Sequence, residues 1–422
     1  MRVLIVNTSE RTGGAAIAAN RLMMALKNNG IKARMLVRDK QTDQMAVVSI
    51  PTSWKLTWKF IWERLVILFA NRLSYKNIFQ VDIANTGTDI SQMFEFKQAD
   101  VIHLHWVNQG FLSMKNLNAI MQSGKPVVVT MHDMWYFTGI CHYSGDCKKY
   151  ITKCEKCPIL YGGVVGDLAQ DVFNKKRKMF MGHNVVFVGC SQWISDLCRR
   201  SRLAKGHTIL SIPNAINTDL FAPKNKSVAR SETKLPEEKF LILFGSQRIT
   251  DKRKGFDYLA EACNIIKRKY PELIDQIGVV VLGENSDKVK SQLPFDVYPV
   301  NYVSSQKELV RLYNAVDLYV TPSLQDNLPN TIVEAMSCGI PCVGFNVGGI
   351  PEMINHKENG YVANYQDAED FANGIYWCMQ SDYYKSLCTN ARNKAVQTYS
   401  QDRVAHSYSE VYDMAIQMNR KR

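Results

Sequence analysis

The stretch from Leu318 to Glu352, LYVTPSLQDNLPNTIVEAMSCGIPCVGFNVGGIPE, constrains the fold of this chain more than any other. A β-rich run closed by Pro322 is followed by a polar loop and then by a short apolar-periodic segment from Ile332 to Cys338. Gly339 ends that segment, and a new strand begins at Pro341. The stretch therefore predicts a strand, a loop, a short helix and a second strand.

The start of this short helix is expected to hold a phosphate. Asn330 is placed to act as the N-cap, which leaves the N–H groups of Thr331 and its neighbours at the positive end of the helix dipole. Such an end, past the carboxyl edge of a parallel sheet, suits a phosphate. Asp326 and Glu334 frame the loop and would repel a phosphate unless they face neutral groups such as sugar hydroxyls. A generic helix start, with Asp326 capping a turn and Glu334 complementing the dipole, explains the same residues.

The remainder of the chain predicts an α/β protein. Residues 1–7 read as a buried parallel strand, followed by a loop containing Gly13-Gly14, a helix over 15–28 and a strand over 32–38. Strand, Gly-rich turn, helix and strand are the opening unit of a doubly wound domain. The two glycines fit a tight turn, or a loop whose backbone closely approaches a ligand. Further strands are expected over 101–107, 126–133, 184–191, 207–214, 240–246, 278–283, 297–303, 318–321 and 341–345.

Length and composition are those of an ordinary globular protein, and the net charge indicates anionic partners. The 422 residues favour two or three domains, and 46% of them are hydrophobic. We expect a cytoplasmic chain, because residues 1 and 2 lead directly into a strand and no apolar run approaches the ~20 residues that span a bilayer. The formal charge of +13 indicates nucleic acid, anionic lipid or phosphorylated substrates. Since no familiar nucleic-acid motif is evident, lipid headgroups and diphosphates are favoured.

A helix rich in tryptophan and basic residues is predicted from Trp54 to Leu73. Three tryptophans, Trp54, Trp58 and Trp62, recur every four positions among Lys55, Lys59, Arg64 and Arg72. A helix with an aromatic stripe and basic flanks can lie in a membrane interface. An aromatic stripe is more often part of a domain core. Both interpretations stay open on the sequence alone.

Histidines mark the ends of two predicted strands in the first half of the chain. His103 and His105 alternate within one strand and so share a face, which fits a ligand-facing position or satisfied core histidines equally. His132 falls at the carboxyl end of the strand over 126–133, where ligands bind in open α/β sheets. Asp133 follows it and is given a supporting role.

Four cysteines cluster in CHYSGDCKKYITKCEKCP: Cys141, Cys147, Cys154 and Cys157. A cytoplasmic chain is unsuited to stable disulfides, so clustered thiols point to a metal. Four thiolates would close a structural tetrahedral zinc site without an open position for catalysis, with His142 as an alternate ligand. Free thiols are the other interpretation, because only one pair has the C-x2-C spacing.

Several motifs together resemble the retaining glycosyltransferases of family four. Glu334-Ala335-Met336-Ser337-Cys338-Gly339 matches the second half of that family's Glu-x7-Glu signature, and Asp326 stands where the first glutamate is expected. Residues 212–223, IPNAINTDLFAP, resemble the family's interdomain hinge, with Ala215 in place of Gly and Asn217 in place of Asp. Arg248 and Lys254 resemble its Arg/Lys pair ahead of a glycine, although Arg253 fits the spacing better.

The resemblance implies a GT-B fold of two doubly wound Rossmann-like domains facing an interdomain cleft. The first would be an acceptor-side domain over 1–207, with a C-terminal helix at about 400–422 packing back on it; residues 208–399 would bind the nucleotide sugar. Arg248, Lys254 and the amides near Asn330 and Thr331 would bind the diphosphate. Glu334 would hold the ribose, Asp326 the sugar hydroxyls and His132 the reacting sugar, while the Gly13-Gly14 loop would face the cleft.

The expected activity is retaining transfer of a hexosyl group from a nucleoside-diphosphate sugar to an acceptor hydroxyl, without a catalytic metal. The acceptor is predicted to be a glycan or lipid-linked glycan of a surface polysaccharide, such as exopolysaccharide, capsule or O-antigen. A peripheral location of the protein on the inner face of the plasma membrane would suit such an acceptor. A sugar-nucleotide epimerase of the same fold and a non-catalytic sugar-nucleotide-binding protein are the alternatives. Donor, linkage and oligomeric state stay open.

Overall fold

The computed structural model describes residues 1–51, 53–161, 163–380 and 382–420. Its backbone contacts divide the chain into a first unit, Met1–Asn214 with Val404–Arg422, and a second unit, Ala215–Arg403. The division therefore falls after Asn214 and not after residue 207 as predicted. The reason is that β7 (Thr208–Ser211) pairs with β6 (Val185–Gly189) in the first sheet. Positions 421 and 422 of the predicted C-terminal helix lie outside the described residues.

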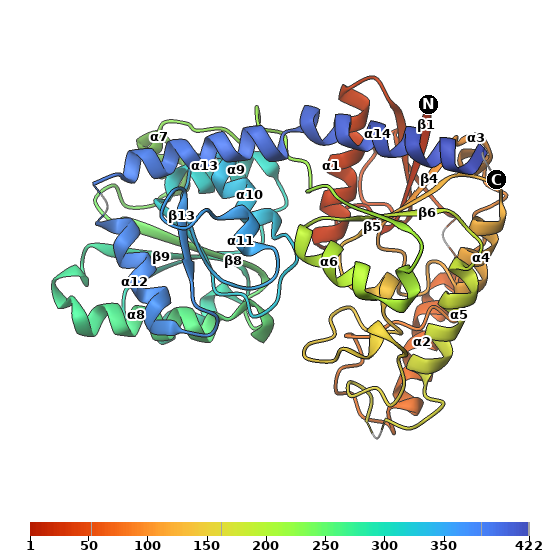
Figure 1. Ribbon diagram of the computed structural model, residues 1–422. Coiled ribbons are helices and arrows are strands. Elements are labelled where there is room, and N and C mark those ends of the chain that lie inside the picture. The colour runs from red at the N-terminus through yellow and green to blue at the C-terminus, as the bar shows by residue number, and fades with distance from the viewer. Residues whose placement is uncertain (52, 162, 381, 421–422) are drawn as a thin grey trace. The chain divides into compact units, whose positions relative to one another are not determined.

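The first unit alternates strands and helices along the chain (Figure 1). Its strands, besides β6 and β7, are β1 (Arg2–Ser9), β2 (Lys32–Asp39), β3 (Val47–Ser49), β4 (Val101–Leu104) and β5 (Val127–Met131). Its helices are α1 (Gly14–Asn28), α2 (Trp54–Ala70), α3 (Phe94–Gln98), α4 (Met114–Gln122), α5 (Leu168–Phe180), α6 (Gln192–Arg200) and most of α14 (Gln401–Arg420). Short 3-10 turns are η1 (Trp135–Phe137), η2 (Lys149–Ile151) and η3 (Arg202–Ala204).

All neighbouring strands of the first sheet are parallel, in the order β3-β2-β1-β4-β5-β6-β7. Strands β4, β5 and β6 are buried along their whole length, as expected for a sheet covered on both faces. The chain reverses its direction of winding between β1 and β4. At such a switch point the loops after the two strands diverge and leave room for a ligand at the carboxyl edge.

The final helix, α14, packs on one face of this first sheet. In β4, Ile102 and Leu104 join the core shared with α2, α4 and α5, so His103 between them points to the other face. There His103 Nδ1 lies 2.8 Å from the hydroxyl of Tyr412, and its Nε2 lies 2.7 Å from Thr130 Oγ1. The hydroxyl of Tyr408 completes the set at 2.8 Å from Thr130. His103 is therefore a satisfied core histidine and attaches the C-terminal helix to the sheet.

The second unit repeats the alternation. Its strands are β8 (Phe240–Arg248), β9 (Ile277–Glu284), β10 (Asp296–Val300), β11 (Leu318–Thr321), β12 (Cys342–Phe345) and β13 (Gly360–Ala363). Its helices are α7 (Lys226–Thr233), α8 (Phe256–Lys269), α9 (Gln306–Ala315), α10 (Asn330–Ser337), α11 (Ile350–Met353), α12 (Ala368–Met379) and α13 (Tyr384–Tyr399). Its 3-10 turns are η4 (Lys252–Lys254), η5 (Pro271–Leu273) and η6 (Ser286–Gln292).

The second sheet is also parallel, in the order β10-β9-β8-β11-β12-β13. Figure 1 shows α8 and α12 on one face of this sheet and α9, α10 and α13 on the other. Its switch point lies between β8 and β11. The loop after β8 carries the basic residues singled out in the sequence, and the loop after β11 carries Asp326.

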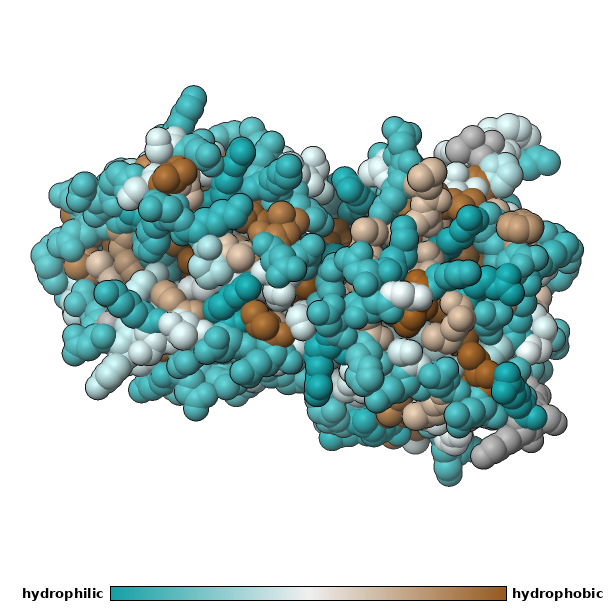
Figure 2. All heavy atoms as spheres, turned by 90° about the horizontal axis from the view of Figure 1, so that it is seen from above, coloured by the Kyte–Doolittle hydropathy of each residue, from teal (hydrophilic) through white to brown (hydrophobic). Residues whose placement is uncertain are grey.

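The predicted α/β class with two doubly wound domains is confirmed. One detail at the key helix is wrong: Asn330 is the first residue of α10, and Pro329 holds the N-cap position. Proline is compatible with this place because its missing N–H has no intrahelical acceptor there. Over the face shown in Figure 2, hydrophobic residues lie singly or in small groups among hydrophilic ones. Among helices of the described segments, none combines the length and apolar content needed to cross a membrane.

Replacing Tyr412 by Phe removes the hydroxyl that contacts His103 and leaves a buried ring nitrogen without that partner. We expect the Tyr412→Phe protein to lose about 1–3 kcal/mol of unfolding free energy, the usual cost of an unsatisfied buried polar group. Urea unfolding followed by circular dichroism measures it. Tyr75→Phe, at a tyrosine that is 77% exposed, is the control and should be neutral. Equal stability of both variants would contradict the attachment of α14 by this contact.

Candidate functional site

Two loops meet at the switch point of the second sheet. The basic loop follows β8 and includes η4, and the acidic loop follows β11 and leads to α10. The amide of Leu324 donates to the carbonyl of Arg253 at 2.8 Å. The Arg253 guanidinium returns a bond to the carbonyl of Gln325, also at 2.8 Å. One bond between backbones and one bond from a side chain to a backbone therefore join the two loops.

Two glycines allow this close approach. Gly255 has a φ of +72°, and a Cβ atom there would lie 1.8 Å from the carbonyl oxygen of Pro322. Gly348 has a φ of +61°, and a Cβ atom there would lie 1.7 Å from the carbonyl oxygen of Asp326. Both positions combine a left-handed backbone with contact against another backbone, which only glycine tolerates. The acidic loop is thus held from two sides.

The central contact of the site is an ion pair between Lys254 and Asp326. Lys254 Nζ lies 2.5 Å from Asp326 Oδ2, and Arg253 Nη1 lies 3.9 Å from the same oxygen. The hydroxyl of Ser323 donates to it at 3.4 Å. Burial alone would raise the pKa of Asp326, but Lys254 and Arg253 hold it below its ordinary value. Asp326 is therefore a carboxylate at neutral pH. The structure thus places Lys254 and Asp326, which were predicted to act at one site, in direct contact.

Arg248 lies at the end of β8 and is more exposed than Lys254. Its side chain is 73% exposed, and its Nε lies 3.4 Å from a carboxylate oxygen of Glu284 at the end of β9. An exposed ion pair of this kind contributes little stability and is easily exchanged for another anion. Arg248 is thus free to turn toward a phosphate at this edge of the sheet.

Helix α10 presents only its first turn to the surface. Asn330 and Thr331 are half-buried, while the following residues are buried. The hydroxyl of Tyr319 donates to Thr331 Oγ1 at 2.7 Å. Glu334 is 5% exposed, and one of its carboxylate oxygens accepts a bond from the hydroxyl of Tyr313 at 2.8 Å. Because α10 has its amino end at the carboxyl edge of the sheet, its dipole favours an anion there.

The Gly13-Gly14 loop of the first unit lies at the switch point of the first sheet. Gly13 precedes α1 with a φ of +90°, and a Cβ atom there would meet no described atom within 4 Å. The Gly13-Gly14 loop follows β1, so its backbone borders open space at the carboxyl edge. This arrangement suits a loop that a ligand approaches, but no contact tests the predicted role.

His132 directly follows β5, and its ring nitrogens contact another histidine and a cysteine. Its Nε2 lies 2.8 Å from His105 Nδ1, and its Nδ1 lies 3.4 Å from Cys190 Sγ. Burial lowers the pKa of His132 to about 4, so the ring is neutral at physiological pH. To contact a sugar hydroxyl, Nε2 has to exchange its bond with His105. The role assigned to His132 stays a prediction.

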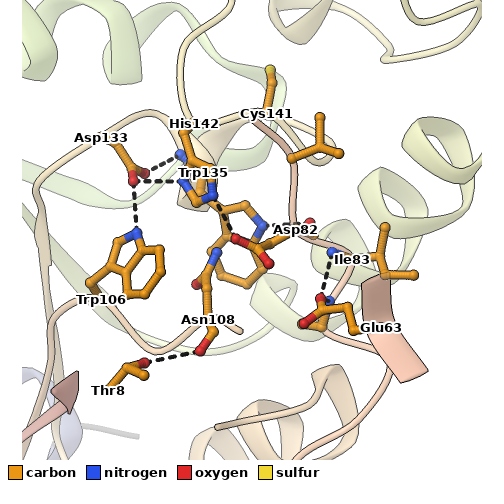
Figure 3. A network of polar contacts seen from close by, with 12 residues as sticks. Thr8, Glu63, Asp82, Ile83, Trp106, Asn108, Asp133, Trp135, Cys141 and His142 are labelled. Carbon is orange, nitrogen blue, oxygen red and sulfur yellow. Dashed lines mark hydrogen bonds and ion pairs between the residues drawn. The ribbon is translucent and has the colours of Figure 1, made fainter. Parts of the chain in front are cut away.

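Asp133, the residue after His132, belongs to a buried network drawn in Figure 3. Its carboxylate accepts bonds from the indole N–H of Trp106 at 2.9 Å and the amide of Trp135 at 2.8 Å. His142 lies between two carboxylates, with Nδ1 2.7 Å from Asp133 and Nε2 2.6 Å from Asp82. Asp133 therefore fixes the segment that follows β5. His142 has two carboxylate partners and does not line the cavity formed by the cysteines.

Burial would lower the pKa of His142, but Asp133 and Asp82 raise it to about 10. Since the folded-state pKa lies above the ordinary value of 6.5, the stabilisation is complete below about pH 6.5 and is lost as pH rises toward 10. Between about pH 6.5 and pH 10, the unfolding free energy of wild type should fall. We expect this fall to exceed that of the His142→Gln variant by more than about 1.4 kcal/mol. Urea unfolding at several pH values compares them, and parallel curves would contradict a charged His142.

The four clustered cysteines line one cavity of about 20 Å³. Cys141, Cys154 and Cys157 are buried, and all four thiols are free. Burial raises the pKa of Cys141 and of Cys154 to about 12, so both are protonated thiols in the metal-free protein. In the part of the chain that the structure describes, no three or more Cys, His, Asp or Glu side chains are arranged to hold a metal ion. The zinc site stays a prediction.

Metal analysis decides between zinc and free thiols. If the four thiolates close around zinc, protein purified with reductant contains about one zinc ion per chain. A Cys154→Ser/Cys157→Ser variant should then lose the metal, and Cys388→Ser should keep it. Metal-free wild type with all four thiols reduced, as counted by thiol titration after unfolding, would reject the site.

Some residues of both switch points were missed by the sequence analysis. Gly348 carries a signal that was available, since a Gly-Gly pair after a strand is a turn signal. Tyr313, the partner of Glu334, sits on α9 and had no local signal. Asn108 follows β4 and is 1% exposed; neither end of its side-chain amide has a partner among the described residues. Only the folded structure reveals which buried polar side chains have a partner and which do not.

Comparisons with known proteins show the family of this chain. A family model described as Glycosyltransferase Family 4 matches residues 12–220, and one described as Glycosyl transferases group 1 matches residues 238–381. The chain belongs to these glycosyltransferases. The family match of the second unit contains both loops of its switch point, and that of the first unit contains the Gly13-Gly14 loop and His132.

Curated relatives match over part of their length. An uncharacterized glycosyltransferase of Haemophilus influenzae is 29% identical over 35% of this chain and 44% of the relative. The putative colanic acid biosynthesis glycosyl transferase WcaC of Escherichia coli is 25% identical over 60% of this chain and 62% of the relative. An Escherichia coli UDP-Gal:α-D-GlcNAc-diphosphoundecaprenol α-1,3-galactosyltransferase is 23% identical over 53% and 58%. The chain thus matches less than two thirds of each of these proteins.

Solved structures agree in fold along almost the whole chain. HepE from Anabaena, determined in complex with UDP, gives a TM-score of 0.65 at 16% identity, over 98% of this chain and 100% of that one. WaaG, a glycosyltransferase of lipopolysaccharide biosynthesis, gives 0.62 at 14% identity, over 98% and 99%. These similarities support the GT-B architecture of two Rossmann-like domains.

Proposed function

We propose that this protein transfers a hexosyl group from a nucleoside-diphosphate sugar to an acceptor hydroxyl, with retention of the anomeric configuration. The observation that carries the proposal is the junction of the basic and acidic loops at the β8/β11 switch point. There Lys254 contacts Asp326, and the amino end of α10 follows in the same loop. Cations and a helix dipole suit a diphosphate, and a carboxylate beside them suits sugar hydroxyls.

The basic side of the site is assigned to the diphosphate. Lys254 supplies a point charge and Arg248 a planar fork, which together neutralise a leaving nucleoside diphosphate. The backbone amides at Asn330 and Thr331 add the positive end of α10. Each cation has a carboxylate partner in the structure, Asp326 for Lys254 and Glu284 for Arg248. Donor binding would therefore rearrange existing ion pairs.

The acidic side of the site is assigned to hydroxyl groups. Asp326 would accept hydrogen bonds from the donor sugar, and Glu334 would hold the ribose. Glu334 needs a small movement for this, because it is buried and already accepts a bond from Tyr313. His132 is retained as a contact of the reacting sugar on the family resemblance. Gly13 and Gly14 are retained as a loop approached by substrate because of the open space beside Gly13.

Retention would result from attack on the same face as departure. The bond between the anomeric carbon and the phosphate oxygen breaks as the acceptor oxygen bonds to that carbon, and the acceptor proton passes to the leaving phosphate oxygen. The chain's own contribution is electrostatic: Lys254, Arg248 and the amino end of α10 stabilise the charge that develops on the diphosphate. No metal ion is assigned a role in this step.

The relatives suggest where to look for substrates. One structure of similar fold was solved with UDP-glucose, and one relative is named for transfer from UDP-Gal to a diphosphoundecaprenol-linked sugar. UDP-sugars are therefore the first donors to test. A lipid-linked glycan of a surface polysaccharide is the acceptor we propose, on the cytoplasmic face of the membrane.

The donor site is tested by turnover with a panel of nucleotide sugars. We expect slow hydrolysis of one donor, with release of the nucleoside diphosphate and of a sugar that first appears in the donor's anomeric configuration. Lys254→Ala should slow this release on the order of a hundredfold, as removal of one transition-state donor commonly does. Lys252→Ala is the matched control, because Lys252 is an exposed lysine of the same loop and should keep wild-type activity.

Three outcomes would overturn the proposal. A sugar epimerised while still attached to its nucleotide would assign the protein to the epimerase class. Tight donor binding without turnover, even with lipid-linked acceptors, would make it a binding protein. Equal loss of activity in Lys252→Ala and Lys254→Ala would show that total loop charge matters and that the Lys254–Asp326 contact does not.

A further inference from the structure

Helix α2 buries charged side chains and exposes aromatic ones. The residues that it buries include a charged pair, with Glu63 fully buried and Arg64 7% exposed. Glu63 accepts bonds from the amides of Ile83 at 2.9 Å and Ala84 at 2.7 Å. Arg64 binds the carboxylate of Asp82 and the carbonyls of Ile78 and Val81. Specific polar contacts therefore fix which face of α2 points inward.

The opposite face of α2 is exposed and aromatic. Trp54 is 70% exposed, Trp58 55%, Trp62 54% and Phe69 67%, with Ile61 beside them. The three tryptophans are four residues apart, Ile61 lies three residues after Trp58, and Phe69 lies seven residues after Trp62, so these side chains form one stripe along the helix. The core interpretation of the tryptophan stripe is thus wrong for all three tryptophans.

Neighbouring segments continue the apolar surface past the end of α2. Leu73, Tyr75 and Phe79 follow the helix and are each at least 60% exposed. The loop at Tyr161 lies against the same end, because its amide donates to Asn71 Oδ1 at 2.5 Å, and Tyr161 is itself 62% exposed. We call the exposed apolar side chains on α2, on the segment after it and at Tyr161 the α2 surface: Trp54, Trp58, Ile61, Trp62, Phe69, Leu73, Tyr75, Phe79 and Tyr161. Contiguous exposure of this kind marks an interaction site, unlike the scattered apolar residues in Figure 2.

The exposed charges on residues 53–79, the segment that carries most of the α2 surface, are all positive. Between residues 53 and 79 the sole acidic residue is Glu63, which is buried. Lys55, Arg72 and Lys76 are exposed on the same segment. Lys59 adds a half-buried ammonium that donates to Thr88 Oγ1 at 2.8 Å. Aromatic side chains ringed by cations, without an exposed carboxylate on the segment, are complementary to an apolar layer beneath anionic headgroups.

We propose that the α2 surface docks the protein on an anionic lipid bilayer, with the tryptophan stripe inserted at headgroup depth. Tryptophan and tyrosine concentrate at membrane–water interfaces, and basic residues add attraction to anionic lipid. Protein interfaces, in contrast, are depleted of lysine. The length and exposure of the stripe fit a helix that lies in the interface plane. This inference rests on the first unit alone and does not depend on the donor or on the assigned chemistry.

Vesicle co-sedimentation tests the proposal with the full chain. The probes are phosphatidylcholine vesicles with and without about 30 mol% phosphatidylglycerol, because the anionic lipid supplies the surface charge. Wild type should bind the anionic vesicles, with its tryptophan emission shifted to shorter wavelength. Trp58→Ser/Trp62→Ser should bind at least about tenfold more weakly, and Lys55→Gln/Arg72→Gln/Lys76→Gln should lose only the preference for anionic lipid. Tyr302→Ser/Tyr383→Ser, at two exposed tyrosines of the second unit, should match wild type.

The tryptophan variant must stay folded, which an unchanged thermal midpoint establishes. It should also retain donor hydrolysis in vesicle-free buffer, since neither tryptophan belongs to the site assigned to the donor. Wild type that binds anionic vesicles no better than Trp58→Ser/Trp62→Ser would overturn the proposal. A reversible dimer that the same substitutions abolish, without vesicle binding, would overturn it in favour of a second copy of the chain.

Discussion

The close approach of Gly255 to Pro322 is the constraint on which the candidate donor site depends. The absence of a side chain at Gly255 lets the basic loop after β8 lie directly on the acidic loop after β11. That approach places Lys254 beside Asp326, and Gly348 holds Asp326 from the other side. The result is a carboxylate kept ionised by its neighbours at the switch point of a parallel sheet, where α/β folds bind ligands.

The fold and the approximate location of this site could be predicted because the responsible signals are local. Buried parallel strands are continuous apolar runs, and glycine and proline mark where the helix of the key stretch ends. The grouping of Lys254 with Asp326 followed from the family resemblance, and the structure supplies the contact itself. The boundary between units was misplaced because the sequence of β7 does not show which sheet it joins.

Long-range polar contacts could not be predicted from local patterns. Glu63 and Arg64 look like the solvated side of an amphipathic helix until Asp82 and the amides after it are brought against them. His142 stands next to a cysteine in sequence, yet its partners Asp82 and Asp133 arrive from two other segments. In both cases the partners of a buried ionisable side chain are distant from it in sequence. The burial of Glu63 and Arg64 also explains why the tryptophans on the opposite face of α2 are exposed.

We assign Lys254 to the diphosphate and Asp326 to the sugar, although the two side chains contact each other. Calorimetric titration of the nucleoside diphosphate and of its sugar into Lys254→Ala and Asp326→Asn tests this assignment directly. We predict that Lys254→Ala weakens the binding of both ligands by about tenfold or more. Asp326→Asn should weaken the binding of the nucleotide sugar and leave that of the diphosphate unchanged or tighter. Equal weakening of both ligands by both substitutions would contradict it, because the pair would then act only as a structural link between the loops.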